Sequence, residues 1–394
     1  MTGPVTRERL VWGFVVLHLA VVVLRMATLS GEWTDAANGW ILGDWLLSYE
    51  AGFARRGLPG ALILALCDAT SWSPLVFVRA IQLALYAATP ALVLHLVRGR
   101  RLELWFVLLV VSPATFLFPV LNVQGAGRKE ILFFALLASW CLVLRRDRVL
   151  GSGGRAVFGA AVAALMLCHE GLLFFVPFFT AAYLIAQRCN DRPIRPLDAL
   201  FLPLTALAVA ALVGLFGHSD GAAYQVLCAG LVARGIDPSI CHGVLGWPTG
   251  LAENLRISLQ AMRSAELYPL AGGLALLPLL VLVAARAPAD HPRVRYLLRV
   301  VGAAVALTAP LYFLGADFGR WIHATAMSVL LVTISALPPR GPEPCDPAPR
   351  WSGLGAVAIT LAYMSTWMIQ HHGGPGVGGN GVMWRLLRAL FAGG

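Results

Sequence analysis

The fold is decided first by an apolar run near the N-terminus, residues 10–29, which reads LVWGFVVLHLAVVVLRMATL. About 20 mostly apolar residues in a helix are enough to cross the hydrocarbon core of a bilayer. The run lacks a convincing small-residue cleavage site, so we interpret it as a span and not as a cleavable signal peptide. The sequence therefore predicts that this stretch crosses a membrane.

Composition extends the prediction to the whole chain. Of its 394 residues 58% are hydrophobic and 13% are charged, with a mean hydropathy of +0.75, whereas soluble domains contain roughly 45–50% apolar residues. We predict an all-α polytopic integral membrane protein with about 11 transmembrane helices, at residues 10–29, 74–97, 104–120, 131–145, 156–168, 172–187, 198–216, 269–286, 297–315, 322–337 and 351–369. A shorter run, 58–66, predicts a re-entrant or interfacial piece.

The arginines predict the orientation. The net charge of +10 is spread over short clusters between apolar runs, which is the pattern of the positive-inside rule and not of a nucleic-acid binder. With Arg7 and Arg9 inside, alternate loops carry the remaining clusters, at residues 98–101, 145–148, 188–195, 293–295 and 340–350. We therefore predict a cytoplasmic N-terminus and a polar cavity that faces outward. The Ala, Gly, Leu, Val and Arg bias indicates a GC-rich bacterial genome, hence the bacterial cytoplasmic (inner) membrane.

The domain prediction follows from the loop lengths. Residues 1–380 form a single transmembrane helical domain, in which outer loops 31–73 and 217–268 make a small cap. Residues 381–394 read as a C-terminal amphipathic interfacial helix. Cys228 and Cys241 lie in the second of these loops, and either a disulfide or two free thiols fits the sequence.

The first outer loop carries candidate catalytic and phosphate-binding residues. Residues 31–60 read GEWTDAANGWILGDWLLSYEAGFARRGLPG. Arg55 and Arg56 are suited to bind a phosphate or diphosphate through two guanidinium forks; the alternative is that they pair with Glu50. Asp35, Asp44 and Glu50 each remain a candidate for the general base.

Three further groups of charges fall on the predicted outer side. Arg128 and Lys129 precede a membrane helix, where two cations oppose the helix dipole unless an anion joins them, snorkelling being the alternative. His169 and Glu170 form either an acid–base couple or the hydrogen-bonded tip of a helical hairpin. The three residues Asp317, Arg320 and His323 share one side of a helix start, with a simple salt bridge as the alternative.

A metal ion is not assigned. His371 and His372 next to the outer carboxylates leave a divalent metal ion open as a cofactor, but the chain has no fixed ligand spacing such as HExxH.

The motifs TDAANGWILGDW (34–45), YEAGFARRGLPG (49–60), GRKE (127–130) and DFGRWIH (317–323), together with the many spans, resemble a broad class of proteins. This class is the bacterial membrane glycosyltransferases and surface-polysaccharide polymerases that use undecaprenyl-linked donors. In the transferases the resemblance implies Asp35 or Asp44 as the base. In the polymerase and ligase branch it implies outer arginines and a histidine, which match Arg55, Arg56, Arg128, Arg320 and His169 or His323. The large cap of ligases is represented at most by residues 217–268.

We therefore expect transfer or polymerisation of sugars from a polyprenyl-(di)phosphate donor to a glycan acceptor, at the outer face of the membrane. The expected partners are the lipid bilayer, the lipid-linked donor, the acceptor and other envelope-assembly proteins. The main alternative is a secondary transporter or flippase for an anionic solute or lipid. Transporters usually place charges near the midplane and have internal repeats, and neither feature is evident here.

Overall fold

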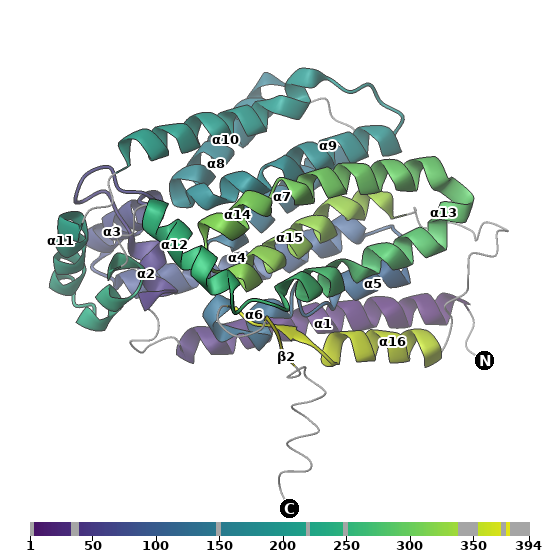
Figure 1. Ribbon diagram of the computed structural model, residues 1–394, viewed down its shortest axis with the longest axis horizontal. Helices are drawn as coiled ribbons and strands as arrows, with labels where there is room; N and C mark the ends of the chain where they lie inside the picture. Colours follow the sequence, from purple (N-terminus) through teal and green to yellow (C-terminus); the bar gives the residue numbers. More distant parts are fainter. Residues whose placement is uncertain are drawn as a thin grey trace, which may run out of the picture.

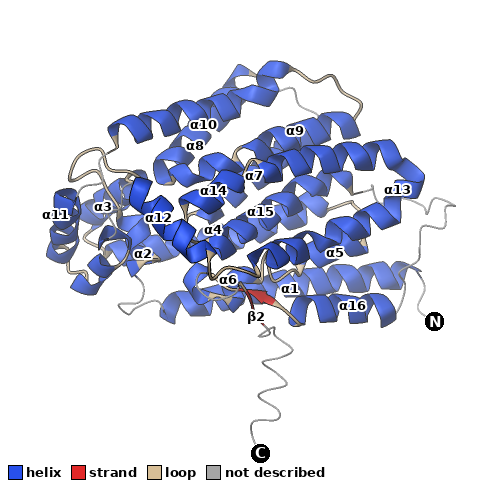
Figure 2. Ribbon diagram, in the orientation of Figure 1, coloured by secondary structure: helices blue, strands red, loops and turns tan. Residues whose placement is uncertain are grey.

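The chain forms a helical bundle. The computed structural model describes residues 4–32, 39–146, 151–217, 221–246, 251–337, 354–371 and 376–378 (Figures 1 and 2). Its α-helices are α1 (Pro4–Glu32), α2 (Leu42–Leu46), α3 (Leu58–Thr70), α4 (Pro74–Val97), α5 (Leu104–Val110), α6 (Phe118–Leu121), α7 (Glu130–Arg145), α8 (Ser152–Cys168), α9 (Pro177–Cys189), α10 (Pro196–Phe216), α11 (Gly221–Ala233), α12 (Leu251–Met262), α13 (Tyr268–Ala306), α14 (Ala309–Leu314), α15 (Phe318–Thr333) and α16 (Leu354–Ser365). Short 3-10 helices are η2 (Val123–Gly125), η3 (Glu170–Phe175), η4 (Pro238–His242), η5 (Val244–Gly246) and η6 (Ile334–Ala336), and strands β1 (Met368–Ile369) and β2 (Val377–Gly378) pair antiparallel.

Within the described residues, six helical stretches are long and apolar enough to cross a membrane. They are Glu8–Leu29, Pro74–Val97, Glu170–Cys189, Pro196–Phe216, Tyr268–Arg286 and Pro292–Leu314. The last two include the two halves of α13, which bends at one end of the bundle in Figure 1. The predicted count of about eleven is not confirmed, because the other predicted spans are shorter helices, such as α7 and α15 with 16 residues each.

Helix α15 lies in the centre of the bundle. All of its residues are buried, and it contacts α5, α7, α9 and α13. Its hydroxyl side chains are satisfied within the helix: those of Thr325, Ser328 and Thr333 donate to the carbonyls four residues earlier at 2.6–2.7 Å. Such back-bonding allows hydroxyl side chains inside an apolar core.

The predicted span 104–120 is not one continuous helix. Helix α5 ends at Val110 and α6 begins at Phe118. Pro113 accounts for the break, because proline lacks an N–H and disfavours helical backbone in the residue before it. The freed carbonyls find other donors: Thr115 Oγ1 donates to Leu109 O at 2.6 Å, and His323 Nδ1 lies 2.9 Å from Ala114 O. The break is therefore a buried and satisfied feature.

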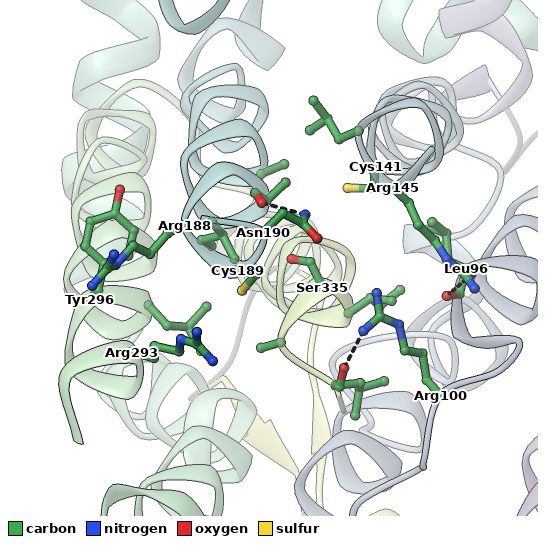
Figure 3. A pocket seen from close by; sticks show the side chains of 18 of the residues that line it. Leu96, Arg100, Cys141, Arg145, Arg188, Cys189, Asn190, Arg293, Tyr296 and Ser335 are labelled. Carbon is green, nitrogen blue, oxygen red and sulfur yellow. Dashed lines mark hydrogen bonds between the residues drawn. The ribbon is translucent and has the colours of Figure 1, made fainter. Parts of the chain in front are cut away.

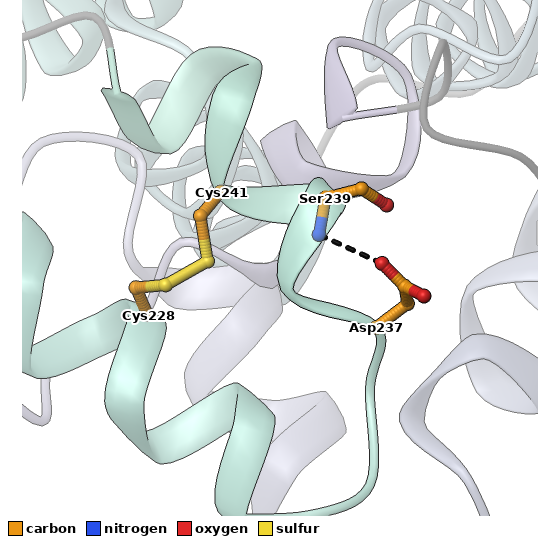
Figure 4. The surroundings of a disulfide bond; sticks show 4 residues. All are labelled: Cys228, Asp237, Ser239 and Cys241. Carbon is orange, nitrogen blue, oxygen red and sulfur yellow. Dashed lines mark hydrogen bonds between the residues drawn. A yellow bond between two sulfur atoms is a disulfide. The ribbon is translucent and has the colours of Figure 1, made fainter.

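Segments from the two long predicted outer loops lie together at the left end of the bundle in Figure 1. Helix α2 contacts α3, η4 and η5, and α11 packs on the same 3-10 helices. The backbones come very close: a Cβ on Gly243 would lie 2.0 Å from the carbonyl carbon of Gly39. Cys228 on α11 and Cys241 on η4 form a disulfide (Figure 4). Of the two alternatives that fit the sequence, a disulfide or two free thiols, the structure has the disulfide. The predicted helix at 381–394 lies outside the described residues.

We expect two cysteines to become reactive only after reduction. In denatured protein that has never been reduced, a maleimide will label two fewer thiols than after reduction, as counted by intact-mass measurement. Replacing Cys228 and Cys241 together by serine should lower the free energy of unfolding of the cap by about 3 kcal/mol, because the disulfide closes a short loop of 13 residues. Equal labelling before and after reduction would show two free thiols instead.

A close backbone approach fixes the start of α15. A Cβ on Gly319 would lie 1.9 Å from Gln370 O, and Gly319 N donates to His371 O at 3.2 Å. We expect Gly319→Ala to lower stability by about 1–3 kcal/mol, because the β1 segment must move away. Gly302→Ala in α13 is the matched control, since no atom lies within 4 Å of its Cβ position. Thermal melting of the detergent-purified variants checks this, and equal melting temperatures would contradict it.

Candidate functional site

Charged side chains from distant parts of the sequence meet near the cap end of the bundle. We call this group the polar cluster. It consists of Asp44, Arg56, Arg128, Lys129, Glu130, Glu170, Asp317 and Arg320. Four elements begin at or beside it: α2, α7, η3 and α15. Seven of the eight residues were predicted as separate site candidates in four different loops, and the ion pairs Asp44–Lys129, Arg56–Glu170 and Glu130–Arg320 now link these loops.

Asp44 is the buried anion of the polar cluster. It is 2% exposed, and its Oδ1 lies 3.6 Å from Lys129 Nζ and 3.9 Å from Arg56 Nη1. Burial alone would raise the pKa of Asp44, but the nearby cations, Lys129 first, outweigh burial and bring this pKa below its usual value. Asp44 therefore stays ionised as a counter-ion for the cations. A carboxylate so stabilised is a weak proton acceptor.

Arg56 and Glu170 form the more open edge of the cluster. Arg56 Nε and Nη2 both donate to the Glu170 carboxylate, at 3.1–3.2 Å, and the two side chains are 31% and 25% exposed. Arg56 adopts a positive φ of 61°, which turns the chain between α2 and α3. The alternative pairing of these arginines with Glu50 is not observed for Arg56.

Glu50 is not part of the polar cluster. Its Oε1 accepts from Arg234 Nη2 at 2.6 Å, and the same guanidinium binds both carboxylate oxygens of Asp68 at 2.8 Å. This network ties α11 to α3. The structure thus separates Glu50 from the other general-base candidates. Its partner is Arg234 in the cap, a residue that the sequence did not indicate.

The loop before α7 is held by neutral groups, which present Arg128 and Lys129. Gly127 O accepts from both Trp45 Nε1 and Gln82 Nε2 at 2.7 Å, and Gly127 N donates to the Tyr86 hydroxyl at 3.1 Å. The φ of Gly127 is +67°, a conformation that favours glycine. The two residues that follow are buried, and Lys129 is 0% exposed.

Arg128 differs from the other cations of the cluster. It donates to two backbone carbonyls, Trp40 O and Gln124 O, and within the described residues no carboxylate lies within ion-pair distance of it. Burial, and then the nearby charge of Arg320, lower the pKa of Arg128 to about 10. A buried guanidinium without a directly bonded anion is costly. Arg128 is therefore the position in the polar cluster at which an ion pair with an external anion would be most favourable.

Arg320 has the opposite situation. It donates to both Glu130 and Asp317, and its guanidinium lies 5.1 Å from the Trp321 ring centroid. Asp317 is 30% exposed as a side chain, and His371 Nε2 lies 3.7 Å from Asp317 Oδ1. Four cations and four carboxylates make the cluster neutral as a whole, but Arg320 holds two carboxylates and Arg128 none. Mutual neutralisation alone does not explain that distribution.

The two predicted site histidines have structural contacts. His323 stacks on Phe118 with ring centroids 4.5 Å apart, and its Nδ1 satisfies Ala114 at the break after α5. His169 Nδ1 accepts from Gly171 N at 3.1 Å and so caps η3, next to Glu170. Both are buried. Through these contacts the two histidines help to fix the backbone beside the charged residues of the polar cluster.

The remaining predicted residues lie at the edge of this region. Arg55 is half-buried. Asp35 and His372 lie outside the described residues. Glu130 was not among the predicted site residues, although its position directly after Arg128 and Lys129 could have indicated it. His371 was considered only for a metal site. Among the described residues, no group of three or more His, Cys, Asp or Glu side chains is placed to hold a metal ion.

Comparison with known proteins identifies a family. A family model described as uncharacterised membrane protein Rv1490 matches residues 11–243, more than half of the chain. No curated protein and no solved structure matches. The matched region contains Asp44, Arg56, Arg128, Lys129 and Glu170, and it ends before Asp317 and Arg320.

Proposed function

The chain belongs to the membrane-protein family Rv1490, and we propose that it transfers or polymerises sugars from a polyprenyl-(di)phosphate-linked donor. It is a multi-pass membrane protein with several apolar helices. The observation that carries the proposal is Arg128, a buried guanidinium bonded to carbonyls in a cluster whose other arginines hold carboxylates. A donor phosphate is the anion that would complete it.

The placement of charges supports an outward-facing site. The arginine-rich predicted inner loops meet elsewhere in the bundle, where Arg100, Arg145, Arg188 and Arg293 line one cavity. That end is cytoplasmic if the positive-inside rule applies. The polar cluster, near the cap with its disulfide, then faces the outer, oxidising side. Lipid-linked sugars for surface glycans are consumed on that side.

In the proposed reaction an acceptor hydroxyl oxygen attacks the anomeric carbon of the donor sugar. The bond between that carbon and the phosphate oxygen breaks, and the electron pair leaves with the polyprenyl (di)phosphate. Arg128 and Arg56 stabilise the charge that develops on the leaving phosphate, as preorganised cations do in transition states. The hydroxyl proton goes to a carboxylate.

Glu170 and Asp317 are the described cluster carboxylates best placed to accept that proton. Their side chains are 25% and 30% exposed, whereas Asp44 is 2% exposed. When the donor binds, the arginine paired with either carboxylate must turn toward the phosphate. The loss of this cation raises the basicity of the carboxylate. Asp35 keeps its predicted role as an alternative base.

Transport of an anionic lipid is the second candidate function. The break between α5 and α6 favours it, because transporters often bind substrate at interrupted helices. The broken segment touches His323 on α15, the helix that also carries Arg320. Under this alternative the phosphate would bind at the same cluster without loss of the sugar.

A deletion strain tests the proposal. We expect mass spectrometry of its lipid extract to show an accumulated lipid-linked glycan that wild-type protein removes. Glu170→Gln or Asp317→Asn should fail to remove it, with a loss of about 100-fold or more, as for general acid–base catalysis. Glu50→Gln is the matched control and should act like wild type. If the glycans of the deletion strain match those of the parent, the proposal fails. If intermediates accumulate only on the inner leaflet, transport replaces transfer.

A further inference from the structure

A basic cavity lies between α7, α9, α13 and η6, away from the polar cluster. It has a volume of about 290 Å³, close to the lower end of the ~300–1,000 Å³ found for small-molecule sites (Figure 3). The described residues that line it include five arginines and no carboxylate: Arg100, Arg145, Arg188, Arg286 and Arg293. Segments far apart in the sequence therefore place like charges around one space.

Three of these arginines are fixed by the protein. Arg145 donates to His95 O and Leu96 O, Arg100 donates to Leu337 O at 2.8 Å, and Arg286 binds both oxygens of Glu103 at 2.8–2.9 Å. They close helix ends at one side of the cavity. Burial, and then the charge of Arg145, lower the pKa of Arg100. The fixed arginines therefore add positive charge to this side of the cavity.

Arg188 and Arg293 both approach the carboxylate of Asp191. Arg188 Nη1 is 3.9 Å and Arg293 Nη2 is 3.6 Å from the carboxylate of Asp191, whose side chain is 69% exposed. Ion pairs of this length at the surface contribute little. Arg188 comes from α9 and Arg293 from α13, and in Figure 3 both lie on the same side of the view as Tyr296. Two guanidinium forks from neighbouring helices suit a phosphate, which can accept hydrogen bonds from both.

The rest of the lining is apolar. Ile185, Leu282, Leu297 and Leu337 continue the cavity into the bundle. A second hollow, of about 320 Å³, shares Arg188 and Tyr296 with the first and adds Arg295 and Arg299. A ligand that fits this space carries negative charge at one end and apolar surface at the other.

We propose that this cavity binds the phosphate of an anionic membrane phospholipid, with Arg188 and Arg293 on the phosphate and the apolar wall against its chains. Basic pockets between membrane helices on the cytoplasmic side are suited to such headgroups. The bound lipid bridges α9 and α13, two helices in contact within the bundle. It is a site for a resident lipid, separate from the polar cluster.

Native mass spectrometry of the detergent-purified chain tests this. The probes are dioctanoyl phosphatidylglycerol and dioctanoyl phosphatidylcholine. Wild type should retain phosphatidylglycerol in preference, and Arg188→Gln/Arg293→Gln should lose at least about tenfold in affinity, as expected for charge-assisted hydrogen bonds. Arg195→Gln, an exposed arginine of the same α9–α10 region outside the cavity, should bind like wild type.

Two results would overturn the proposal. One is equal retention of phosphatidylglycerol by wild type and the double variant; the other is equal retention of the two lipids by wild type. If inorganic phosphate raises the melting temperature of wild type but not of the double variant, and phosphatidylglycerol has no advantage, a soluble phosphate ligand replaces the lipid. Should the double variant fail to fold, as judged by size exclusion, Arg188→Gln and Arg293→Gln are measured singly, and unchanged binding in both overturns the proposal.

Discussion

Asp44→Asn is expected to lower the free energy of unfolding by about 3–5 kcal/mol, because it removes one partner of a buried ion pair. Lys129 is 0% exposed, and within the described residues Asp44 is the carboxylate at ion-pair distance from it, at 3.6 Å. After the substitution the ammonium stays buried without a counter-ion. Thermal melting of detergent-purified protein measures the loss.

The double variant Asp44→Asn/Lys129→Met should recover most of that stability, because no buried charge is left unpaired. The pH dependence has a defined sign as well. Since the cations lower the native pKa of Asp44 below its ordinary value of about 4, its stabilisation is complete above that pH and is lost as the pH falls through the native pKa. An Asp44→Asn variant that melts like wild type would contradict the counter-ion assignment. If the double variant is stable but makes no glycan, Asp44 would again be a candidate for the general base.

Much of the fold could be predicted because bilayer physics restricts the sequence. Long apolar runs at 10–29, 74–97 and 198–216 are helices in the structure. The run at 104–120 is broken, and hydropathy cannot show this because a buried turn with satisfied carbonyls is as apolar as a helix. Short helices such as α15 are also indistinguishable from spans by composition, since the centre of the bundle excludes water as the bilayer does.

The site could be predicted as a set of residues but not as a set of contacts. Out-of-place charges identified Arg56, Arg128 and Lys129 because a charge at membrane depth needs a purpose. Partners depend on tertiary packing: Arg56 takes Glu170, 114 positions away, and Glu50 takes Arg234. The histidines were expected beside the chemistry, but aromatic packing and a cap hydrogen bond hold them, interactions with no sequence spacing of their own.

Arg128→Gln is expected to weaken binding of a prenyl diphosphate by about 10- to 100-fold, the value of a charge-assisted hydrogen bond. Farnesyl diphosphate is the probe, and its dissociation constant for the purified protein is the measurement. Stability should stay the same or rise, because the substitution removes a buried charge that no carboxylate balances directly. Weaker binding without lower stability is the signature of a residue kept for a ligand.

Arg234→Gln provides the control for Arg128. Arg234 is bonded to Glu50 and Asp68 in the cap, so its loss should leave farnesyl diphosphate binding unchanged. Two results would contradict the assignment: equal affinities for wild type and Arg128→Gln, or an Arg128→Gln variant that melts well below wild type yet binds normally. The second result would make Arg128 a structural residue that neutralises its neighbours.

Conversion of lipid-linked sugars by the purified protein tests the central claim most directly. Lipid-linked glycans extracted from the deletion strain would be incubated with wild type or with Arg128→Gln, and the products followed by mass spectrometry. We expect wild type to release polyprenyl phosphate or diphosphate and to yield a glycan enlarged by the donor sugars, and Arg128→Gln to do so at least about tenfold more slowly. Recovery of the lipid-linked glycans unchanged, with wild type stably folded and bound to them, would contradict the transfer reaction.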